Sequence, residues 1–511
     1  MPRFAAPCTL ALLLFCFAPT ASAQQGACIN GTATAGSRTF SCNSVDLLSN
    51  VSLSQMNAGD GNDIWGWTDP VTGTEYALMG LDNGTAFVDI SDPMAPVYLG
   101  KLPTHTSSST WRDIKVYADH AYVVSEAGGH GMQIFDLTQL RDVENPPQTF
   151  EETDHYDGVG GSHNVAINEV TGFAYIVGAS SCNGGLHMVN IQNPGLQEPA
   201  FAGCFDDDGY THDAQCVVYD GPDPDYQGHE ICAVAQGASF NPANNHFSFV
   251  DVTNKNAPTL IAQVLYSNPG YAHQGWFTED QAYFIANDEL DERNFGNNTR
   301  TLVFDVRDLD NPEFLDVYIH PTASIDHNLY VRGRYAFQSN YTSGLRIVDL
   351  QSSGVSGSVP SLEEVAFFDT YPSSDSDSFN GTWSNYPFFE SGVVIVSDIQ
   401  SGLFVLDPQI DTTPPVANED AAPGTSALSA AYPNPTTART QIDLVLGDTQ
   451  RVEVVVYDVL GRRVADLFDG ALGAGEARTF SFDASALPAG LYFVRATGET
   501  FAETRQVSVT R

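Results

Sequence analysis

A phrase that recurs along the middle of the chain limits the possible folds more than any other feature of the sequence. Each copy is a short alternating strand that ends in an acidic or amide residue. These end positions are Asp89, Asp136, Asn190, Asp251, Asp305, Asp349 and Asp407. Successive copies lie about 50 residues apart, close to the period of propeller repeats. We interpret the recurring residue as a turn-capping group, since Asp and Asn bond their own backbone in turns.

Each copy belongs to a group of four expected strands. In the second group, strands are expected at 113–117 and 121–127, ahead of the copy that starts at 131. β-Branched and aromatic residues alternate there and are broken by Gly, Pro, Asn and Asp, which is typical of strands joined by turns. Seven such groups predict an all-β fold, with a seven-bladed β-propeller over residues 45–409.

The last group lacks a fourth strand, and a spare strand precedes the first group. The last group ends at Gln409, whereas the segment 45–53 alternates like a strand but has no group of its own. An unpaired edge strand promotes association between chains. We therefore expect the segment 45–53 to complete the seventh blade and to close the ring.

The N-terminus has the pattern of a targeting segment. Arg3 precedes an apolar run at 10–17, and Ala21-Ser22-Ala23 is a small-residue cleavage site, so residues 1–23 are predicted to be a signal peptide. The segment 24–44 that follows contains cysteines. No later apolar run reaches the roughly 18 residues of a membrane helix, so no transmembrane helix is expected.

Six cysteines remain after the predicted signal peptide. An even number in an oxidising compartment predicts disulfides. The sequence leaves the pairing open, but proximity favours Cys28–Cys42, Cys182–Cys204 and Cys216–Cys232.

The charge balance narrows the possible partners. The chain has 63 acidic and 21 basic residues, a formal net charge of -42. A surface this acidic cannot displace the counterions of nucleic acid, so nucleic acid and anionic lipid are excluded as general partners.

The C-terminal part is predicted to be a separate module. Residues 410–427 are rich in Pro, Ala and acidic residues and are interpreted as a linker. Short alternating strands then follow through residues 428–511, which predicts a small, Ig-like β-sandwich.

Two resemblances to known families follow from particular phrases. SHNVAI from 162, THDAQC from 211 and DHNLYVRGRYAF from 326 resemble the choice-of-anchor B family, which is built from LVIVD repeats. That family name implies varied surface-attachment tails and no established activity. AYPNPTT at 431–437, VYDVLGRRV at 456–464 and LPAGLYFVRATG at 487–498 resemble the sorting domain of type IX secretion cargo. This resemblance implies the type IX secretion machinery as a partner and an extracellular or outer-surface location.

One column of the repeats suggests chemistry. The first strands align at Trp65, Trp111, His163, His212, His273, His327 and Trp383. Innermost strands line the channel of a propeller, so four histidines would form an arc around its axis. Converging imidazoles are good ligands for zinc, iron or copper. Asp213 and Asp326 adjoin two of them and are interpreted as supporting or turn groups.

Acidic residues are expected at the same mouth. The run at 287–292 follows a second strand, whose end lies where the first strand begins, and Asp288, Glu289 and Asp291 form a candidate calcium site. The alternative interpretations are a solvated charge run and a hydrated ring of structural histidines.

Two functions follow as hypotheses. The first is a secreted or cell-surface binding protein that takes a protein or glycan ligand at the propeller mouth. The second is a metal-dependent hydrolase or lyase that uses the histidine ring. The sequence favours binding because it contains no G-x-S-x-G, P-loop or H-E-x-x-H motif, although it leaves open whether the protein is an enzyme.

Overall fold

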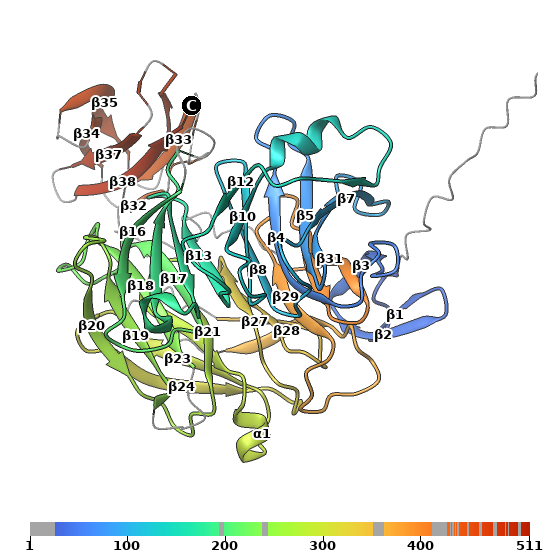
Figure 1. Ribbon diagram of the computed structural model, residues 1–511. Helices are drawn as coiled ribbons and strands as arrows, with labels where there is room; N and C mark the ends of the chain where they lie inside the picture. Colours follow the sequence, from blue (N-terminus) through green and yellow to red (C-terminus); the bar gives the residue numbers. More distant parts are fainter. Residues whose placement is uncertain are drawn as a thin grey trace, which may run out of the picture.

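The structure is a computed structural model (Figure 1), and it describes residues 26–193, 199–237, 244–350, 362–410 and, with short gaps, 427–510. The predicted signal peptide and almost all of the predicted linker lie outside these residues. Strands dominate the described chain, and its one α-helix is α1 (Asp291–Phe295). The all-β prediction is therefore confirmed.

The named strands among the described residues between 26 and 410 form seven sheets. The first contains β4 (Gly61–Thr68), β5 (Glu75–Leu81), β6 (Gly84–Asp89), β7 (Val97–Pro103) and β11 (Gln148–Thr149). The second contains β8 (Arg112–Tyr117), β9 (His120–Ser125), β10 (Met132–Asp136) and β12 (Asp154–Tyr156). The third contains β13 (Asn164–Asn168), β14 (Phe173–Val177), β15 (Leu186–Asn190) and β16 (Ala200–Phe205).

In each of the next four sheets, the four strands named here pair in an antiparallel arrangement. The fourth contains β17 (Asp213–Val218), β18 (Glu230–Gln236), β19 (His246–Asp251) and β20 (Thr259–Val264). The fifth contains β21 (Ala272–Phe277), β22 (Tyr283–Asp288), β23 (Arg300–Asp305) and β24 (Glu313–Ile319). The sixth contains β25 (Leu329–Arg332), β26 (Tyr335–Ser339), β27 (Leu345–Asp349) and β28 (Glu363–Phe368). The seventh contains β29 (Thr382–Tyr386), β30 (Val394–Asp398), β31 (Gly402–Pro408) and β3 (Val45–Val51).

The sheets are arranged in a β-propeller-like order. The first strand of each sheet, from β4 and β8 through to β25 and β29, contacts the first strand of the next sheet, and β29 contacts β4. The hydrophobic core is divided among neighbouring sheets. Phe87 of β6, for example, stacks on Phe135 of β10 with ring centroids 4.7 Å apart. The first strands thus come together at the centre, while the apolar cores lie between the sheets.

Strand β3 pairs with β31, although the two strands lie far apart in the sequence. Val45 lies opposite Pro408 and Val51 lies opposite Leu403 in an antiparallel register. Val45, Leu47, Ser49 and Val51 are buried, and the residues that alternate with them are half-buried. The alternation that marked the segment 45–53 in the sequence thus places one face of β3 in the core.

The cysteine-containing segment forms a hairpin that the sequence did not predict. Strands β1 (Thr32–Ala35) and β2 (Arg38–Asn43) pair with each other, and β2 pairs with β28, which widens the sixth sheet to six strands. The structure contains the disulfides Cys28–Cys42, Cys182–Cys204 and Cys216–Cys232. These are the pairings that proximity in the sequence favoured.

The recurring acidic position caps turns, as predicted. Its side-chain oxygen accepts a hydrogen bond from the backbone amide two residues later in five of the seven copies, namely Asp89, Asp136, Asn190, Asp251 and Asp305. Such Asx-turns bend the chain out of the third strand. These residues therefore shape the turns of the repeat.

The C-terminal residues form two further sheets around a core of their own. One sheet contains β32 (Ala427–Leu428), β33 (Arg439–Val445) and β36 (Arg478–Asp483). The other contains β34 (Gln450–Asp458), β35 (Arg463–Leu472), β37 (Gly490–Thr497) and β38 (Ala502–Val509). The buried residues of this core all lie between 428 and 509.

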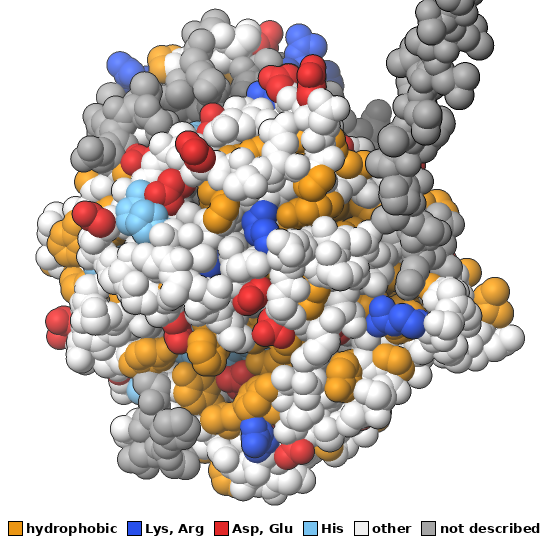
Figure 2. Space-filling view, turned by 45° about the vertical axis from the view of Figure 1, so that its right-hand side comes forward, with side chains coloured by type: hydrophobic (Ala, Val, Ile, Leu, Met, Phe, Trp, Pro, Cys, Tyr) orange, Lys and Arg blue, Asp and Glu red, His pale blue; other side chains and the backbone are white. Residues whose placement is uncertain are grey.

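Acidic side chains are spread over the face drawn in Figure 2 and do not gather in a single patch. Within the described part of the chain, no helix has both the length and the apolar character needed to cross a bilayer.

Candidate metal centre

Four histidines lie next to one another where the first strands of the third to sixth sheets begin. The ring centroids of His163 and His212, of His212 and His273, and of His273 and His327 are each 4.3 Å apart. The ring of Trp383 from β29 follows at 4.9 Å from His327. The repeat therefore places residues that are about 50 positions apart in the sequence in a continuous arc.

The two remaining aromatic positions of the predicted column do not belong to this arc. Trp65 packs edge-on against Tyr330 and Tyr386, with ring centroids 5.6 and 5.1 Å away. Trp111 is 46% exposed. The alignment of the first strands was therefore wrong for Trp65, which lies four residues along β4 from its start at Gly61.

Backbone carbonyls orient two of the imidazoles. His212 Nδ1 donates to the carbonyl of His273 at 2.9 Å, and His327 Nδ1 donates to the carbonyl of Trp383 at 2.5 Å. A proton held on Nδ1 leaves the Nε2 lone pair free to bind a metal. At the end of the arc, His163 Nδ1 lies 2.6 Å from Glu126 Oε1.

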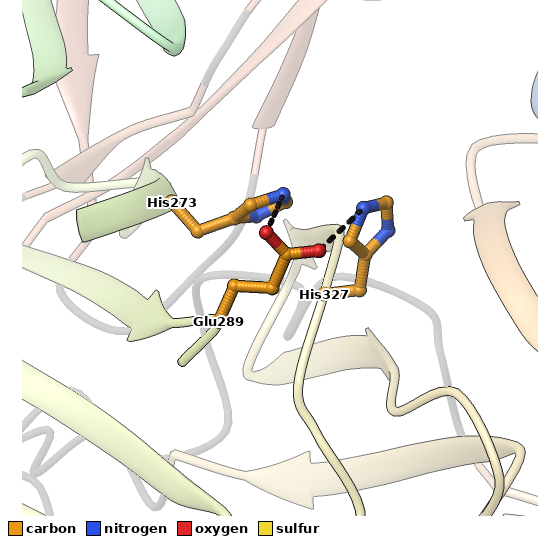
Figure 3. Close-up of side chains that lie close together, drawn as sticks. All are labelled: His273, Glu289 and His327. Atoms are coloured by element: carbon orange, nitrogen blue, oxygen red, sulfur yellow. Dashed lines mark ion pairs between the residues drawn. The ribbon is translucent and has the colours of Figure 1, made fainter. Parts of the chain in front are cut away.

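Glu289 lies between two of these imidazoles (Figure 3). Its Oε2 is 4.0 Å from His273 Nε2, and its Oε1 is 3.7 Å from His327 Nε2. These separations are longer than hydrogen bonds. Ligands held about 2.1 Å from one tetrahedral zinc ion lie roughly 3.4 Å apart. One ligand atom from each of the three residues lies within 4.8 Å of the other two, so the set fits around a single ion.

His273 has the least explained environment in the cluster. Its side chain is 1% exposed, and among the described residues neither ring nitrogen has a hydrogen-bond partner. A buried polar atom without a partner is costly and rare. A bound metal ion would provide the missing partner for Nε2.

Burial sets the charge state of the cluster. It lowers the pKa of His327 to about 3 and holds the pKa values of His212 and His273 well below the usual range. Burial also raises the pKa of Glu289 to about 7, while the hydroxyl of Tyr341 opposes that rise. The imidazoles of His212, His273 and His327 are therefore neutral at neutral pH, which is the form that binds metals.

The structure separates the three residues of the predicted calcium set. Asp288 holds a turn, since its oxygens accept from the hydroxyl of Tyr266 and from the amides of Gly270, Tyr271 and Leu290. Asp291 is bonded to Arg300. Of the set, Glu289 is the residue that faces the histidines.

The adjoining acidic residues also have distinct places. Asp213 accepts a hydrogen bond from the amide of Ala214 at 2.6 Å and lines a 310 Å³ cavity with Lys115 and Trp276. Burial and the charge of Asp113 raise the pKa of Asp213 to about 7. Asp326 is buried beside α1, and neither of its oxygens has a partner in the described structure.

Sequence reasoning missed one residue of the centre. Tyr341 donates its hydroxyl hydrogen to Glu289 Oε1 at 2.9 Å, and its ring centroid lies 4.7 Å from that of His327. It belongs to the turn between β26 and β27, in a phrase that no other repeat shares. A periodic pattern therefore could not reveal it.

Two family models match segments of the chain. Residues 430–510 match the model of the secretion system C-terminal sorting domain, and residues 71–104 match the LVIVD repeat. No curated protein matches the chain. The sorting domain indicates type IX secretion, and with it export to the cell surface or the extracellular space.

Solved structures resemble the chain at low sequence identity. One is the extracellular domain of a putative one-component system from B. thetaiotaomicron, with 11% identity and a TM-score of 0.42, covering 91% of this chain and 59% of that one. The chain thus spans 59% of the length of that relative. A β-propeller domain from Myceliophteria thermophila has 11% identity and a TM-score of 0.39, covering 68% of this chain and 96% of that one. A chain of the COPII outer coat vertex has 10% identity and a TM-score of 0.45, covering 76% of this chain and 96% of that one.

Proposed function

We propose that this protein is an exported, seven-bladed β-propeller that binds a divalent transition metal at His273, Glu289 and His327. Strand β3 completes the seventh blade, and an Ig-like sandwich at the C-terminus carries the sorting signal. The propeller repeats resemble those of choice-of-anchor B proteins. The metal, in turn, offers open coordination positions to a protein or glycan ligand outside the cell.

One observation carries this proposal. A carboxylate lies between two imidazole Nε2 atoms at 4.0 and 3.7 Å, and no donor on either ring reaches it within hydrogen-bond distance. Two histidines and one carboxylate are a known ligand set for zinc. Because these are three protein ligands, the fourth position of a tetrahedral zinc ion stays open. Zinc is the metal that this donor set fits best, with iron and copper as the alternatives among imidazole-binding metals.

Ligand binding is proposed ahead of hydrolysis because the carboxylates beside the histidines already have other roles. Among the described residues, two carboxylates form ion pairs with the four histidines. Glu289 is a ligand in this proposal, and Glu126 is bonded to His163. Metal-dependent hydrolysis also needs a group that can take a proton from the metal-bound water. A metal that binds a partner through its open position needs no such group.

Zinc titration tests the proposed centre. We expect the purified, chelator-treated protein to bind one zinc ion in calorimetry. His273→Ala and His327→Ala should each weaken binding by roughly 100-fold or more, because even the loss of a residue behind the ligands commonly costs 10–100-fold. His120→Ala is the matched control, since His120 lies in β9 and bonds the carbonyl of Ala118. Absence of zinc binding, or equal affinity in all three variants, would contradict the centre.

Removing the C-terminal module tests the export route. A chain that ends at residue 426 should remain in the periplasm of its natural host, because it lacks the sorting domain matched at 430–510. Fractionation and immunoblotting against the full-length chain would measure this. Equal amounts of both chains outside the cell would show that export does not need the module.

A further inference from the structure

A cavity of 310 Å³ lies among the first strands of the sheets, and it shares no lining residue with the metal centre. Strands β4, β8, β13, β17, β21 and β29 contribute to its wall, and they are the first strands of six of the seven sheets. Glu169, just after β13, lines the cavity and is exposed, so the cavity reaches the surface. Small-molecule sites occupy roughly 300–1,000 Å³, so this volume suits one small molecule.

Four contiguous aromatic rings line the cavity. The ring centroid of Trp65 lies 5.1 Å from that of Tyr386, the centroids of Tyr386 and Phe388 are 5.3 Å apart, and those of Phe388 and Trp276 are 6.3 Å apart. Trp276, Tyr386 and Phe388 are half-buried, although each packs against its neighbours. The rings therefore offer apolar surface to a molecule in the cavity.

Two glutamine side chains in the wall have an unused donor. Gln215 Oε1 accepts from the amide of Phe277 at 2.7 Å, and Gln274 Oε1 accepts from the amide of Leu329 at 2.5 Å. Each contact joins the first strand of one sheet to the first strand of the next and fixes the orientation of the amide group. Within the described structure neither Nε2 makes a hydrogen bond, although Gln274 is 4% exposed. A donor without a partner is costly, so a ligand that fills the cavity must supply acceptors.

The charged groups of the wall restrict the charge of the ligand. Asp213 Oδ1 accepts from the next backbone amide, and in the described part of the chain its Oδ2 has no donor. Lys115 is the cation among the lining residues, and its Nζ is already paired with Asp113 Oδ1 at 2.7 Å. With Glu169, the wall thus presents two carboxylates and no free cation. Such a wall repels an anion and provides an acceptor for a ligand that donates.

We propose that this cavity binds a neutral sugar as a single ring. Hydroxyl groups both donate and accept, so they can satisfy Asp213 and the two glutamine amides together. The weakly positive C–H groups of a sugar ring pack on the negative faces of aromatic rings. An organic cation offers no acceptor to Gln215 and Gln274, and an anion is repelled by Asp213 and Glu169. The site goes beyond the proposed function, because it shares no residue with the metal centre and needs no metal.

Calorimetric titration with free sugars tests the proposal. The full chain is kept in chelator, so that the result does not depend on the metal centre. The probes are D-glucose, D-galactose, D-mannose, D-xylose and N-acetyl-D-glucosamine at millimolar concentrations. We expect at least one of them to bind as one molecule per chain and to change the tryptophan fluorescence, since Trp65 and Trp276 line the cavity. Choline, as an organic cation, and gluconate, as an anion, should not bind.

Isosteric variants separate contacts with the ligand from contacts between the strands. Gln215→Glu and Gln274→Glu keep the oxygen that accepts from the next strand but lose the donor, and Asp213→Asn replaces an acceptor by a donor. At mildly alkaline pH, where the carboxyls are ionised, each variant should weaken sugar binding by roughly tenfold or more, because a ligand hydroxyl loses its partner. Gln139→Glu is the matched control and should bind as the unsubstituted chain does, since Gln139 is exposed and donates to Thr153 Oγ1 away from the cavity.

Three results would overturn the proposal. The first is that none of the sugars binds the unsubstituted chain. The second is that binding survives in Asp213→Asn and in both glutamine variants. The third is that choline binds and Asp213→Asn abolishes this binding, which would assign the cavity to an organic cation. Thermal unfolding of each variant checks its folding, and because the variants change three different side chains, the loss of one to misfolding leaves two that decide.

Discussion

Deletion of residues 45–53 is expected to abolish cooperative folding of the N-terminal β-structure. Strand β3 is the fourth strand of the seventh sheet, and its pairing with β31 joins residues some 350 positions apart. The deletion removes the buried side chains of Val45, Leu47 and Val51 from two hydrophobic clusters. Each such side chain contributes about 1.5–3 kcal/mol. The combined loss approaches the roughly 5–15 kcal/mol by which proteins are stable.

Circular dichroism and calorimetry of the purified chains would measure this loss. Leu47→Ala gives a graded version, with an expected cost of about 2–5 kcal/mol for a buried leucine. A chain that ends at residue 410 is the matched control, because the C-terminal core contains only residues between 428 and 509. It should unfold at the same temperature as the full chain. If the chain without residues 45–53 also did so, β3 would not be needed to complete the structure.

The repeat made the architecture and the histidine arc predictable. Strand alternation and the period of about 50 residues place equivalent residues of successive sheets side by side, so His212 and His273 could be expected as neighbours. The antiparallel order of first and second strands also brings the run after β22 to the same end. Both inferences depend only on the periodicity of the strands, which the pattern of apolar residues in the sequence indicates directly.

The details of the centre depend on contacts that have no periodic signal. Two contacts decide which carboxylate of the run 287–292 faces the histidines. The backbone amide of Gly270 donates to Asp288, and Arg300 donates to Asp291, so neither of these carboxylates is free to turn toward the imidazoles. Tyr341 reaches Glu289 from another sheet. Strand β2 joins β28 because that edge was free, a choice made by tertiary packing and not by local sequence.

A second large effect is expected from Lys115→Met, at a buried ion cluster on β8. Lys115 Nζ lies 2.7 Å from Asp113 Oδ1 and 3.8 Å from Asp63 Oδ2, and both carboxylates are at most 5% exposed. Burial lowers the pKa of Lys115, but the charges of Asp113 and Asp63 raise it by more. Removing the ammonium leaves two buried carboxylates without their cation. Breaking a buried pair in this way costs about 3–5 kcal/mol.

Urea unfolding would measure the cost, and Lys101→Met is the matched control. Lys101 donates to Asn83 Oδ1 and to the carbonyl of Asn57, both uncharged acceptors, so its loss should cost about 1 kcal/mol or less. The double variant Lys115→Met with Asp113→Asn should recover part of the stability, because one of the stranded charges is gone. If Lys115→Met lowered the free energy of unfolding only as much as Lys101→Met does, the ion cluster would not contribute to the stability of the fold.

The pH dependence of Lys115→Met distinguishes stranded charge from lost packing. Burial already holds the pKa of Asp63 well above its usual range when Lys115 is present, and removing Lys115 raises it further. A carboxyl whose folded pKa exceeds the unfolded value of about 3.9 stabilises the fold at low pH and loses that contribution as pH rises through the folded pKa. The deficit of the variant should therefore shrink as the pH is lowered from 8 toward about 4. A deficit that stays constant over that range would mean that the lost packing of the long side chain, and not the stranded charge, causes the loss of stability.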